Sequence, residues 1–571
     1  MTEEQKFELE RIRNQFAACI YKPEFMIKEC REERIIMKDG AALRTILYIP
    51  DREGPVPAIL VRTCYPANDY IYRATAEEYC RRGFAYIYQY CRGTGGSDGT
   101  WEPNINERAD GKVTVDWLCS LSWIGNVGYF GCSYLALTGW VIADILPEKV
   151  KTMYLTHYGA FRFTSAYKGG MFRHDVLTAW SMNNAGRPVT ADYLKSCRYR
   201  PHLEVDEAMW GGRLEWYRKW ITSTSRSDEY WNSGFWGMLK EIPEKVNIPI
   251  YMGEGWFDHH LASAIESYQA LSKECRAKSR FLIGAWDHKF IVRLQDRKGE
   301  HFESEDILRA FCWFHDLLVE EKRPKGSVDS YLIGADTWIS QEEFTVQSQE
   351  ELKLYISGSD GEEKCRLSLQ KGKKEGTINF VYDPENPVMT HGAESLLVTR
   401  EEQGSLLQPV PGYRSDVVSI ISEPFLEKVP IMGKIKMELE VSSDAEDTAF
   451  VVKVMEVMED GKAYNMRTGI TTLGYRDGDS KRQEYHPGER VRISIPMWDI
   501  AWEIQKGSRI RIDITSSDFP QYSIHSNYPG GWAEQTKTKK ACQTIYFGGE
   551  EGSYIMLPVL PSPDCSGVSS R

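Results

Sequence analysis

Residues 127–136 read VGYFGCSYLA, and this stretch decides the fold. An apolar run of strand length ends at Gly131, Ser133 follows two residues later, and a helix-forming segment begins. A strand, tight turn and helix in this order are typical of a nucleophile elbow, which lifts a serine hydroxyl above a sheet at a helix N-terminus. Leu135 replaces the usual second glycine, so we expect the small Ala136 to supply the clearance. A serine that only caps the helix is the competing interpretation.

The segments before this stretch alternate between strand and helix. Apolar runs at 43–50, 57–62 and 84–88 have strand length, and residues 70–82 and 109–121 have helical patterning. Such alternation predicts parallel strands joined by crossovers, in a sheet covered on both faces. The sequence therefore predicts an α/β domain with the serine at the carboxyl edge of the strands.

Two later strands end in residues that can complete a catalytic set. Residues 250–253 lead to Asp258, and residues 280–284 lead to His288. A nucleophilic serine needs a base, and the base needs an acid that orients it. The chain order Ser133, Asp258, His288 is the order expected of this architecture.

Alternatives exist for the residues around this set. Asp287 is adjacent to His288 and competes with Asp258, which we prefer because it follows a different strand. His259 and His260 are expected at the surface, at the start of the next helix. A metal site over residues 258–260 lacks a third ligand at suitable spacing, so we expect no metal.

The pattern divides the chain into four parts. Residues 1–159 and 241–349 carry the strand–helix alternation, and residues 160–240 interrupt it as an inserted helical cap rich in tryptophan. Such tryptophans more often form core than binding site, although an apolar pocket would form at a cap. From 350 to 571 the pattern changes to alternation of period two, as in 435–441, which predicts antiparallel strands of a sandwich or jelly roll.

Composition excludes several functional classes. The chain of 571 residues has a net charge of −12 and no long basic run, which argues against nucleic-acid binding. Its 13 cysteines form no CxxC pair or zinc spacing, so we expect buried free thiols in a reducing compartment. The N-terminus has no apolar signal segment, and no apolar run is long enough to span a bilayer. We therefore expect a cytoplasmic protein with no membrane partner.

Further motifs resemble those of one enzyme family. They are RTCY at 62–65, QYCRGTGGSDG at 89–99, DWL at 116–118, GCSYL at 131–135, GWFD at 255–258, GAWDH at 284–288, YDPENPV at 382–388 and SSDFP at 516–520. Together they are similar to the cocaine-esterase and X-prolyl dipeptidyl-peptidase (CocE/NonD) family of α/β-hydrolases. The resemblance covers nearly the whole chain and is weakest in the cap.

This resemblance implies a fold and roles for individual residues. The implied fold is an α/β-hydrolase domain with an inserted helical cap, followed by a C-terminal all-β jelly-roll domain. Ser133 is implied as the nucleophile, His288 as the base and Asp258 as the acid. The hydroxyl of Tyr65 and the backbone amide of Tyr134 are implied to form the oxyanion hole.

The glycine-rich segment 93–99 is implied to be a structural loop. It does not fit a nucleotide-binding G-x-G-x-x-G pattern, because Asp98 stands at the last glycine position. One departure precedes it: Tyr90 stands where relatives usually carry an aspartate. The support of the active-site loops must therefore differ here.

We expect a serine hydrolase that cleaves a small-molecule ester or amide through an acyl-enzyme, without a cofactor, most simply a carboxylesterase or acyl hydrolase. The alternative is an Xaa-Pro dipeptidyl-peptidase or α-amino-acid ester hydrolase. It would need a carboxylate to bind the substrate ammonium, and Glu254 and Asp69 are candidates. A second alternative is an inactive binding protein. The oligomeric state is not determined by the sequence, and a homodimer is the default expectation.

Overall fold

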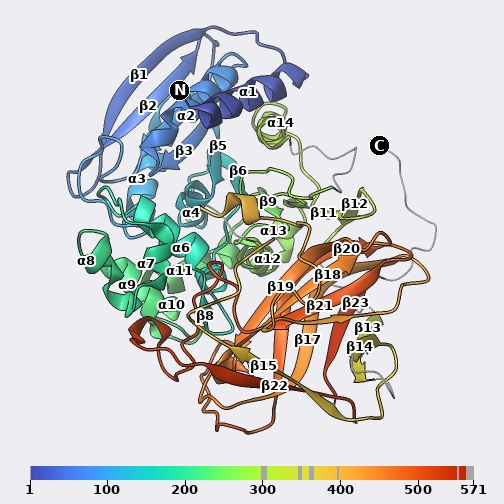
Figure 1. Ribbon diagram of the computed structural model, residues 1–571. Helices are drawn as coiled ribbons and strands as arrows, with labels where there is room; N and C mark the ends of the chain where they lie inside the picture. The colour runs from blue at the N-terminus through green and yellow to red at the C-terminus, as the bar shows by residue number, and fades with distance from the viewer. Residues whose placement is uncertain are drawn as a thin grey trace.

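The computed structural model describes residues 2–296, 305–344, 350–358, 365–394, 398–549 and 552–560. Its first half is built on a ten-stranded sheet of order β1-β2-β4-β3-β5-β6-β9-β10-β11-β12 (Figure 1). The strands are β1 (Ile27–Ile36), β2 (Ala42–Pro50), β3 (Val56–Thr63), β4 (Ala85–Tyr90), β5 (Ile124–Cys132), β6 (Val150–Thr156), β9 (Ile250–Gly255), β10 (Arg280–Gly284), β11 (Ser327–Leu332) and β12 (Thr337–Gln341).

Strands β4, β3, β5, β6, β9, β10 and β11 are parallel, as the strand–helix alternation predicts. The prediction is wrong for β2, which pairs antiparallel with β4, because no helix separates β2 from β3 to return the chain to the same end of the sheet. The carboxyl ends of the parallel strands therefore meet at one edge, where the loops that follow β3, β5, β6, β9 and β10 gather.

Helices cover both faces of this sheet. On one face α1 (Glu3–Ala18), α2 (Asp69–Cys80) and α14 (Asp306–Leu318) pack together and against β2, β4, β5 and β6. On the other face lie α3 (Glu107–Ser120), α4 (Tyr134–Trp140) and α12 (Leu261–Ala270). The central strands are buried along their length, which explains why their sequences are apolar runs without alternation.

The segment between β6 and β9 is mainly helical and is drawn in green in Figure 1. It forms α5 (Arg162–Ala166), α6 (His174–Asn183), α7 (Tyr193–Arg198), α8 (Val205–Met209), α9 (Glu215–Thr222), α10 (Glu229–Asn232) and α11 (Gly234–Lys245), with a short hairpin of β7 (Tyr167–Lys168) and β8 (Met171–Phe172). Trp210, Trp220, Trp231 and Trp236 are buried here. No helix in the described part of the chain has the length and apolar character to cross a membrane.

The C-terminal domain consists of two antiparallel sheets (yellow, orange and red in Figure 1). One contains β13 (Glu350–Gly358), β14 (Cys365–Ser368), β15 (Gly376–Tyr382), β17 (Val429–Ser443), β20 (Val491–Ile504), β22 (Ala541–Phe547) and β23 (Tyr554–Val559). The other contains β16 (Val418–Ile421), β18 (Ala449–Val457), β19 (Ala463–Thr472) and β21 (Arg509–Thr515). In β17 the alternate residues Ile435, Met437, Leu439 and Val441 are fully buried, as period-two alternation predicts.

The C-terminal domain contacts the loops at the carboxyl edge of the first sheet. The guanidinium of Arg467, on β19, lies 5.7 Å from the ring centre of Phe257, in the loop after β9. Ser405 exchanges backbone hydrogen bonds with Arg293 and Gln295, in the segment that follows β10. The β domain therefore holds both loops from outside the sheet.

A buried ion pair joins β3 to α3 beneath this edge. Arg62 has a fully buried side chain and lies 3.0 Å from the carboxylate of Glu107. Arg62 also donates hydrogen bonds to the Gln89 side chain and to the Glu107 carbonyl. The guanidinium thus has partners on two elements, and removal of the carboxylate would leave a buried charge uncompensated.

We expect Glu107→Gln to destabilise the protein by roughly 3–5 kcal/mol, because it leaves the buried charge of Arg62 without its counter-ion. Thermal unfolding followed by circular dichroism measures this as a lower midpoint. The matched control is Asp116→Asn, which breaks the exposed ion pair with Lys112 and should change stability by less than about 1 kcal/mol. Equal midpoints for the two variants would show that the buried pair does not hold β3 to α3.

Candidate active site

Ser133 lies at the turn between β5 and α4 in a strained backbone conformation. Its φ is 60° and its ψ is −128°, in a region that residues other than glycine rarely adopt. The Ser133 amide donates a 2.9 Å hydrogen bond to the Thr156 carbonyl at the end of β6, which fixes the turn to the sheet. The alternative of a simple helix cap is not supported, since the Ser133 side chain makes no capping hydrogen bond.

Gly131 supplies the close approach that this turn requires. A Cβ at this position would lie 2.2 Å from the Leu135 carbonyl oxygen, so a side chain would push α4 away from β5. Near the end of α4, on the side that faces the sheet, a Cβ on Gly139 would lie 2.7 Å from Leu155 in β6. Leu135 itself is buried, so the helix approaches the sheet through Gly131, Ala136 and Gly139 rather than through a second glycine after the serine.

The structure brings Asp258 and His288 together. Nδ1 of His288 lies 2.5 Å from Oδ2 of Asp258, and the Asp258 side chain is fully buried. Burial alone would raise the pKa of Asp258, but the surrounding histidines, His288 first, hold it well below its usual range. Asp287 instead accepts hydrogen bonds from the Lys289 and Ile291 amides and from Arg293. It therefore shapes the loop and does not compete for His288.

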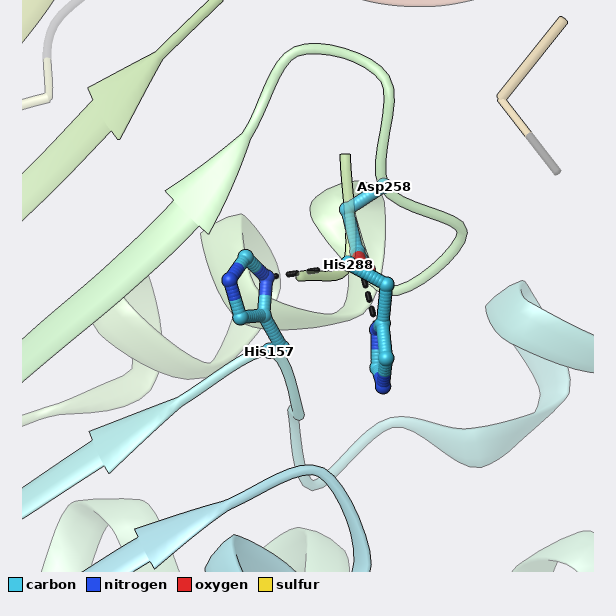
Figure 2. Close-up of side chains that lie close together, drawn as sticks. All are labelled: His157, Asp258 and His288. Carbon is cyan, nitrogen blue, oxygen red and sulfur yellow. Dashed lines mark hydrogen bonds and ion pairs between the residues drawn. The ribbon is translucent and has the colours of Figure 1, made fainter. Parts of the chain in front are cut away.

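His157 is a further histidine at this carboxylate, and sequence reasoning missed it. It follows β6 with a φ of 52°, it is fully buried, and its Nδ1 lies 3.3 Å from Oδ2 of Asp258. Figure 2 shows His157 and His288 approaching Asp258 from different sides. Burial would lower the pKa of His157, but the charge of Asp258 outweighs it and raises this pKa well above the usual value.

Glu254, in β9, completes the buried group behind Asp258. One of its carboxylate oxygens lies 3.5 Å from Nδ1 of His157. Burial, and then the charge of Asp258, raises the pKa of Glu254 to about 8. At neutral pH the group therefore holds an ionised Asp258, a protonated His157 and a neutral Glu254. The signal in the sequence was a glutamate within an apolar strand.

Ligand atoms of His157, Asp258 and His288 lie within 4.8 Å of one another, a grouping compatible with a metal ion. However, Nδ1 of His288 and Oδ2 of Asp258 are 2.5 Å apart, which is hydrogen-bond distance. Two ligand atoms at about 2.0–2.2 Å from an ion would be farther apart than this in a tetrahedral site. The arrangement therefore fits a histidine–carboxylate pair better than a metal centre.

His259 and His260 are not surface residues, and the prediction for them is wrong. Each is 3% exposed, and both line the same cavity as Ser133 and His288. Nδ1 of His260 forms a 2.9 Å hydrogen bond with Ser165, which lies in α5. Burial, as the largest cause, lowers the pKa of both rings well below the usual value, so both are neutral at pH 7. The helices after β6 cover this position, which local sequence does not reveal.

Tyr65 and Tyr134 flank Ser133 in the cavity wall. The indole Nε1 of Trp180 donates a 2.9 Å hydrogen bond to the Tyr65 hydroxyl oxygen, so the Tyr65 proton is directed elsewhere. Burial raises the pKa of Tyr65 well above its usual value, which keeps this hydroxyl protonated. Tyr134 is the first residue of α4, where an amide has no partner within the helix. Trp180 is a second residue that sequence reasoning missed.

These residues open into one large cavity of about 1150 Å³. Its wall includes Ser133, Tyr65, Tyr134 and His288, together with residues of the segment between β6 and β9 and of α1. Asp258, His157 and Glu254 are not part of the wall. A serine, a histidine and two possible hydrogen-bond donors thus face a space large enough for a drug-sized molecule.

Tyr90 contacts the glycine-rich loop through its ring and the Asp69 carboxylate through its hydroxyl. Its ring lies against Gly95, where a Cβ would come within 2.2 Å of it. Its hydroxyl donates a 2.6 Å hydrogen bond to Asp69, which also accepts from Tyr88 and pairs with Arg73. Asp69 therefore belongs to this network and does not line the cavity.

Comparison with known proteins agrees with this architecture. Residues 39–290 match the family model of X-Pro dipeptidyl-peptidase (S15 family), and residues 321–556 match that of the X-Pro dipeptidyl-peptidase C-terminal non-catalytic domain. The chain is 26% identical over 566 residues to the cocaine esterase of Rhodococcus sp. (strain MB1 Bresler), a match that covers 92% of this chain and 97% of that protein.

Solved structures share the fold. An α-amino acid ester hydrolase aligns with a TM-score of 0.78 at 20% identity, covering 93% of this chain and 96% of its own. An aminopeptidase from a marine sediment Thaumarchaeota archaeon aligns with a TM-score of 0.77 at 20% identity and the same coverage. A CocE/NonD family hydrolase from Staphylococcus aureus aligns with a TM-score of 0.63 at 15% identity over 94% of each chain. The chain therefore belongs to the cocaine-esterase and X-prolyl dipeptidyl-peptidase family of α/β-hydrolases, which hydrolyse ester or amide bonds.

Proposed function

We propose that this protein is a serine carboxylesterase or acyl hydrolase that works through an acyl-enzyme on Ser133. The observation that carries the proposal is the placement of Ser133 at a strained turn, in the wall of the cavity that also exposes His288, whose other nitrogen is held by Asp258. No hydrogen bond between Ser133 and His288 is found among the described residues. Such catalytic contacts are often long without substrate and tighten when it binds.

The mechanism follows from these positions. His288 takes the proton of Ser133 as the hydroxyl attacks the substrate carbonyl, and Asp258 stabilises the imidazolium that forms. The Tyr65 hydroxyl and the Tyr134 amide donate hydrogen bonds to the oxyanion. His288 then protonates the leaving group, and water hydrolyses the acyl-enzyme by the same steps. Trp180 and His157 act through Tyr65 and Asp258 as positioning residues.

The charges of the cavity wall favour an ester without a free amine. Among the described residues that line the cavity, the acidic ones are Glu8 and Asp306, and both pair with Arg11. Glu254 is buried behind Asp258, and Asp69 bonds to Tyr88 and Tyr90. Both carboxylates of the described wall thus already lie in an ion pair, whereas an amine-dependent peptidase or ester hydrolase would need a carboxylate that binds the substrate ammonium.

The similarity to an aminopeptidase and an α-amino acid ester hydrolase keeps that alternative testable. A panel of aryl acyl esters and aminoacyl aryl amides, each with and without N-acetylation, separates the two. Loss of turnover on acetylation would favour the amine-dependent enzyme. The inactive binding protein would turn over no substrate and would leave Ser133 unlabelled by a fluorophosphonate.

We also propose the four-part division into residues 1–159, 160–240, 241–349 and 350–571, with the second as the cap and the last as a jelly roll. The helices between β6 and β9 and the two antiparallel sheets support this division. Free thiols at the described cysteines support a cytoplasmic location, although Cys30 and Cys542 are exposed rather than buried.

We expect Ser133→Ala to lower kcat for an aryl ester by about 10⁴-fold or more, because it removes the nucleophile. The loss is measured with p-nitrophenyl butyrate, and fluorophosphonate labelling should vanish with it. Ser120→Ala, at the exposed end of α3, is the control and should keep both. Near wild-type turnover by Ser133→Ala would overturn the mechanism.

Tyr65→Phe should lower kcat about 10²–10³-fold with a small change in KM, because it removes one donor that acts mainly in the transition state. Steady-state kinetics on the same ester measures the split between kcat and KM. The control is Tyr129→Phe, which removes a buried hydroxyl that bonds Thr138 behind the site. If both variants lose the same activity, the effect of Tyr65 is structural rather than electrostatic.

The raised pKa of Glu254 makes stability depend on pH. Folded Glu254 holds its proton up to about pH 8, whereas the unfolded chain releases it near pH 4.3. Unfolding between these values therefore releases a proton, and the free energy of unfolding falls by up to about 1.4 kcal/mol per pH unit as pH rises. Glu254→Gln removes this contribution.

Thermal midpoints of the wild type and of Glu254→Gln between pH 5.5 and pH 7.5 measure the difference. The wild type should lose more stability than the variant as pH rises. Glu244→Gln, at an exposed position of α11, should follow the wild type. Parallel curves for the wild type and Glu254→Gln would show that Glu254 is ionised when folded.

A further inference from the structure

Arg162 is a buried cation in the wall of the active-site cavity. It is the first residue of α5 and is 8% exposed. Its guanidinium lies over two rings that also line the cavity, 5.1 Å from the ring centre of Trp220 and 5.8 Å from that of Tyr158. The charged end of the side chain is therefore on the cavity side of α5.

This guanidinium has no counter-ion in the described part of the chain. Its Nε is buried without a hydrogen-bond partner, and none of the ion pairs among the described residues includes Arg162. Aromatic faces attract a cation, and the Tyr158 hydroxyl can accept a hydrogen bond from Arg162, but neither supplies a negative charge. A buried arginine in a protein is ordinarily paired, so this one lacks the group that would complete it.

The other titratable groups of the cavity wall named here form no ion pair with Arg162. His259 and His260, in the same wall, are kept uncharged by burial. Glu8 and Asp306 are occupied by Arg11, at 2.9 Å and 2.5 Å. Arg187, another cation of the wall, donates its hydrogen bonds to the carbonyls of Trp210 and Gly212. An anionic partner for Arg162 must therefore come from a molecule in the cavity.

We propose that Arg162 is the anion subsite of the enzyme and that the substrate is an ester or amide carrying a carboxylate. This inference rests on the proposed hydrolase activity of Ser133. A carboxylate matches the fork of a guanidinium with two parallel hydrogen bonds, while Tyr158 and Trp220 hold the plane of the guanidinium. The bound carboxylate then supplies both the missing acceptor and the missing charge.

A series of ring contacts along the cavity wall connects Arg162 with the reacting groups. The ring of His288 is 5.9 Å from that of His260, which is 4.5 Å from the ring of Tyr158, the face on which Arg162 lies. On the other side, Trp180, which bonds Tyr65, has its ring 5.9 Å from that of Trp220. Arg162 thus stands where the walls from His288 and from Tyr65 meet, in the same cavity as Ser133.

The test compares esters that differ only in a carboxylate. One series consists of p-nitrophenyl monoesters of succinic, glutaric and adipic acid, each beside its methyl-capped diester. The second consists of 4-acetoxybenzoate and its methyl ester, which place the carboxylate on the leaving group. We expect wild-type kcat/KM to be at least about tenfold higher for the acid than for the capped ester in one series.

Arg162→Met should reduce this acid-to-capped ratio about tenfold or more, to near one, and Arg162→Lys should keep part of it, because lysine retains the charge but not the fork. The control is Arg226→Met, which removes an exposed arginine paired with Glu266 and should keep the wild-type ratio. As a measurement that needs no variant, glutarate should inhibit wild-type turnover of p-nitrophenyl butyrate competitively, and dimethyl glutarate should not.

Two results would overturn the subsite: a wild-type ratio near one in both series, or an unchanged ratio in Arg162→Met. Either result would leave the Ser133 mechanism standing if p-nitrophenyl butyrate is hydrolysed and that turnover is lost in Ser133→Ala. Absence of turnover on every ester, with Ser133 unlabelled, would instead refute the hydrolase mechanism itself and the subsite with it.

Discussion

The buried carboxylate of Asp258 is the constraint on which the site depends. A fully buried anion is costly unless its oxygens are paired and hydrogen-bonded. Asp258 meets this condition with three groups from different elements: Nδ1 of His288 at 2.5 Å, Nδ1 of His157 at 3.3 Å and the backbone amide of His260 at 2.6 Å. These partners follow β10, β6 and β9, so the charge is compensated only when adjacent parallel strands end at the same level. The strand register that brings these loops to one level is therefore also what pairs Asp258 with His288.

Ser133, Asp258 and His288 could be placed from sequence because parallel strands gather their carboxyl ends, so residues just after successive strands become neighbours. His157 occupies the same kind of position after β6, but an isolated histidine in the loop after a strand gave no reason to select it. Trp180 could not be selected either, since its hydrogen bond to Tyr65 spans 115 positions and depends on how α6 folds over the sheet. His259 and His260 were misplaced for the same reason, because a covering layer from distant sequence buries them.

For the fold too, features set by local sequence could be predicted, and features set by contacts between distant segments could not. The strands of the α/β domain show apolar runs because helices cover both faces of their sheet. Strand β17 shows period-two alternation because one of its faces is buried. Both patterns can be read from local sequence. Helix α1 was not predicted because its sequence is largely charged. Its few apolar residues become buried only through packing with α2 and α14. The antiparallel pairing of β2 and the contact of Arg467 with Phe257 depend on tertiary arrangement, for which the sequence carries no local signal.

Electrostatics separates the site into two compartments. Behind His288, the negative charge of Asp258 is balanced by the positive charge of His157, and Glu254 is neutral. This buried group therefore needs no charged group from the substrate. In the cavity, His259 and His260 are neutral and the two acids Glu8 and Asp306 both pair with Arg11, while no carboxylate of the described residues pairs with Arg162. A substrate carboxylate would therefore supply the ion-pair partner that Arg162 lacks. The C-terminal domain contributes to this division from outside, because Arg467 packs on Phe257 next to Asp258 and is itself neutralised by Glu394, 3.1 Å away. The C-terminal domain thus contacts the loop that carries Asp258 through the guanidinium of Arg467. It adds no net charge to the site, because Glu394 pairs with that guanidinium.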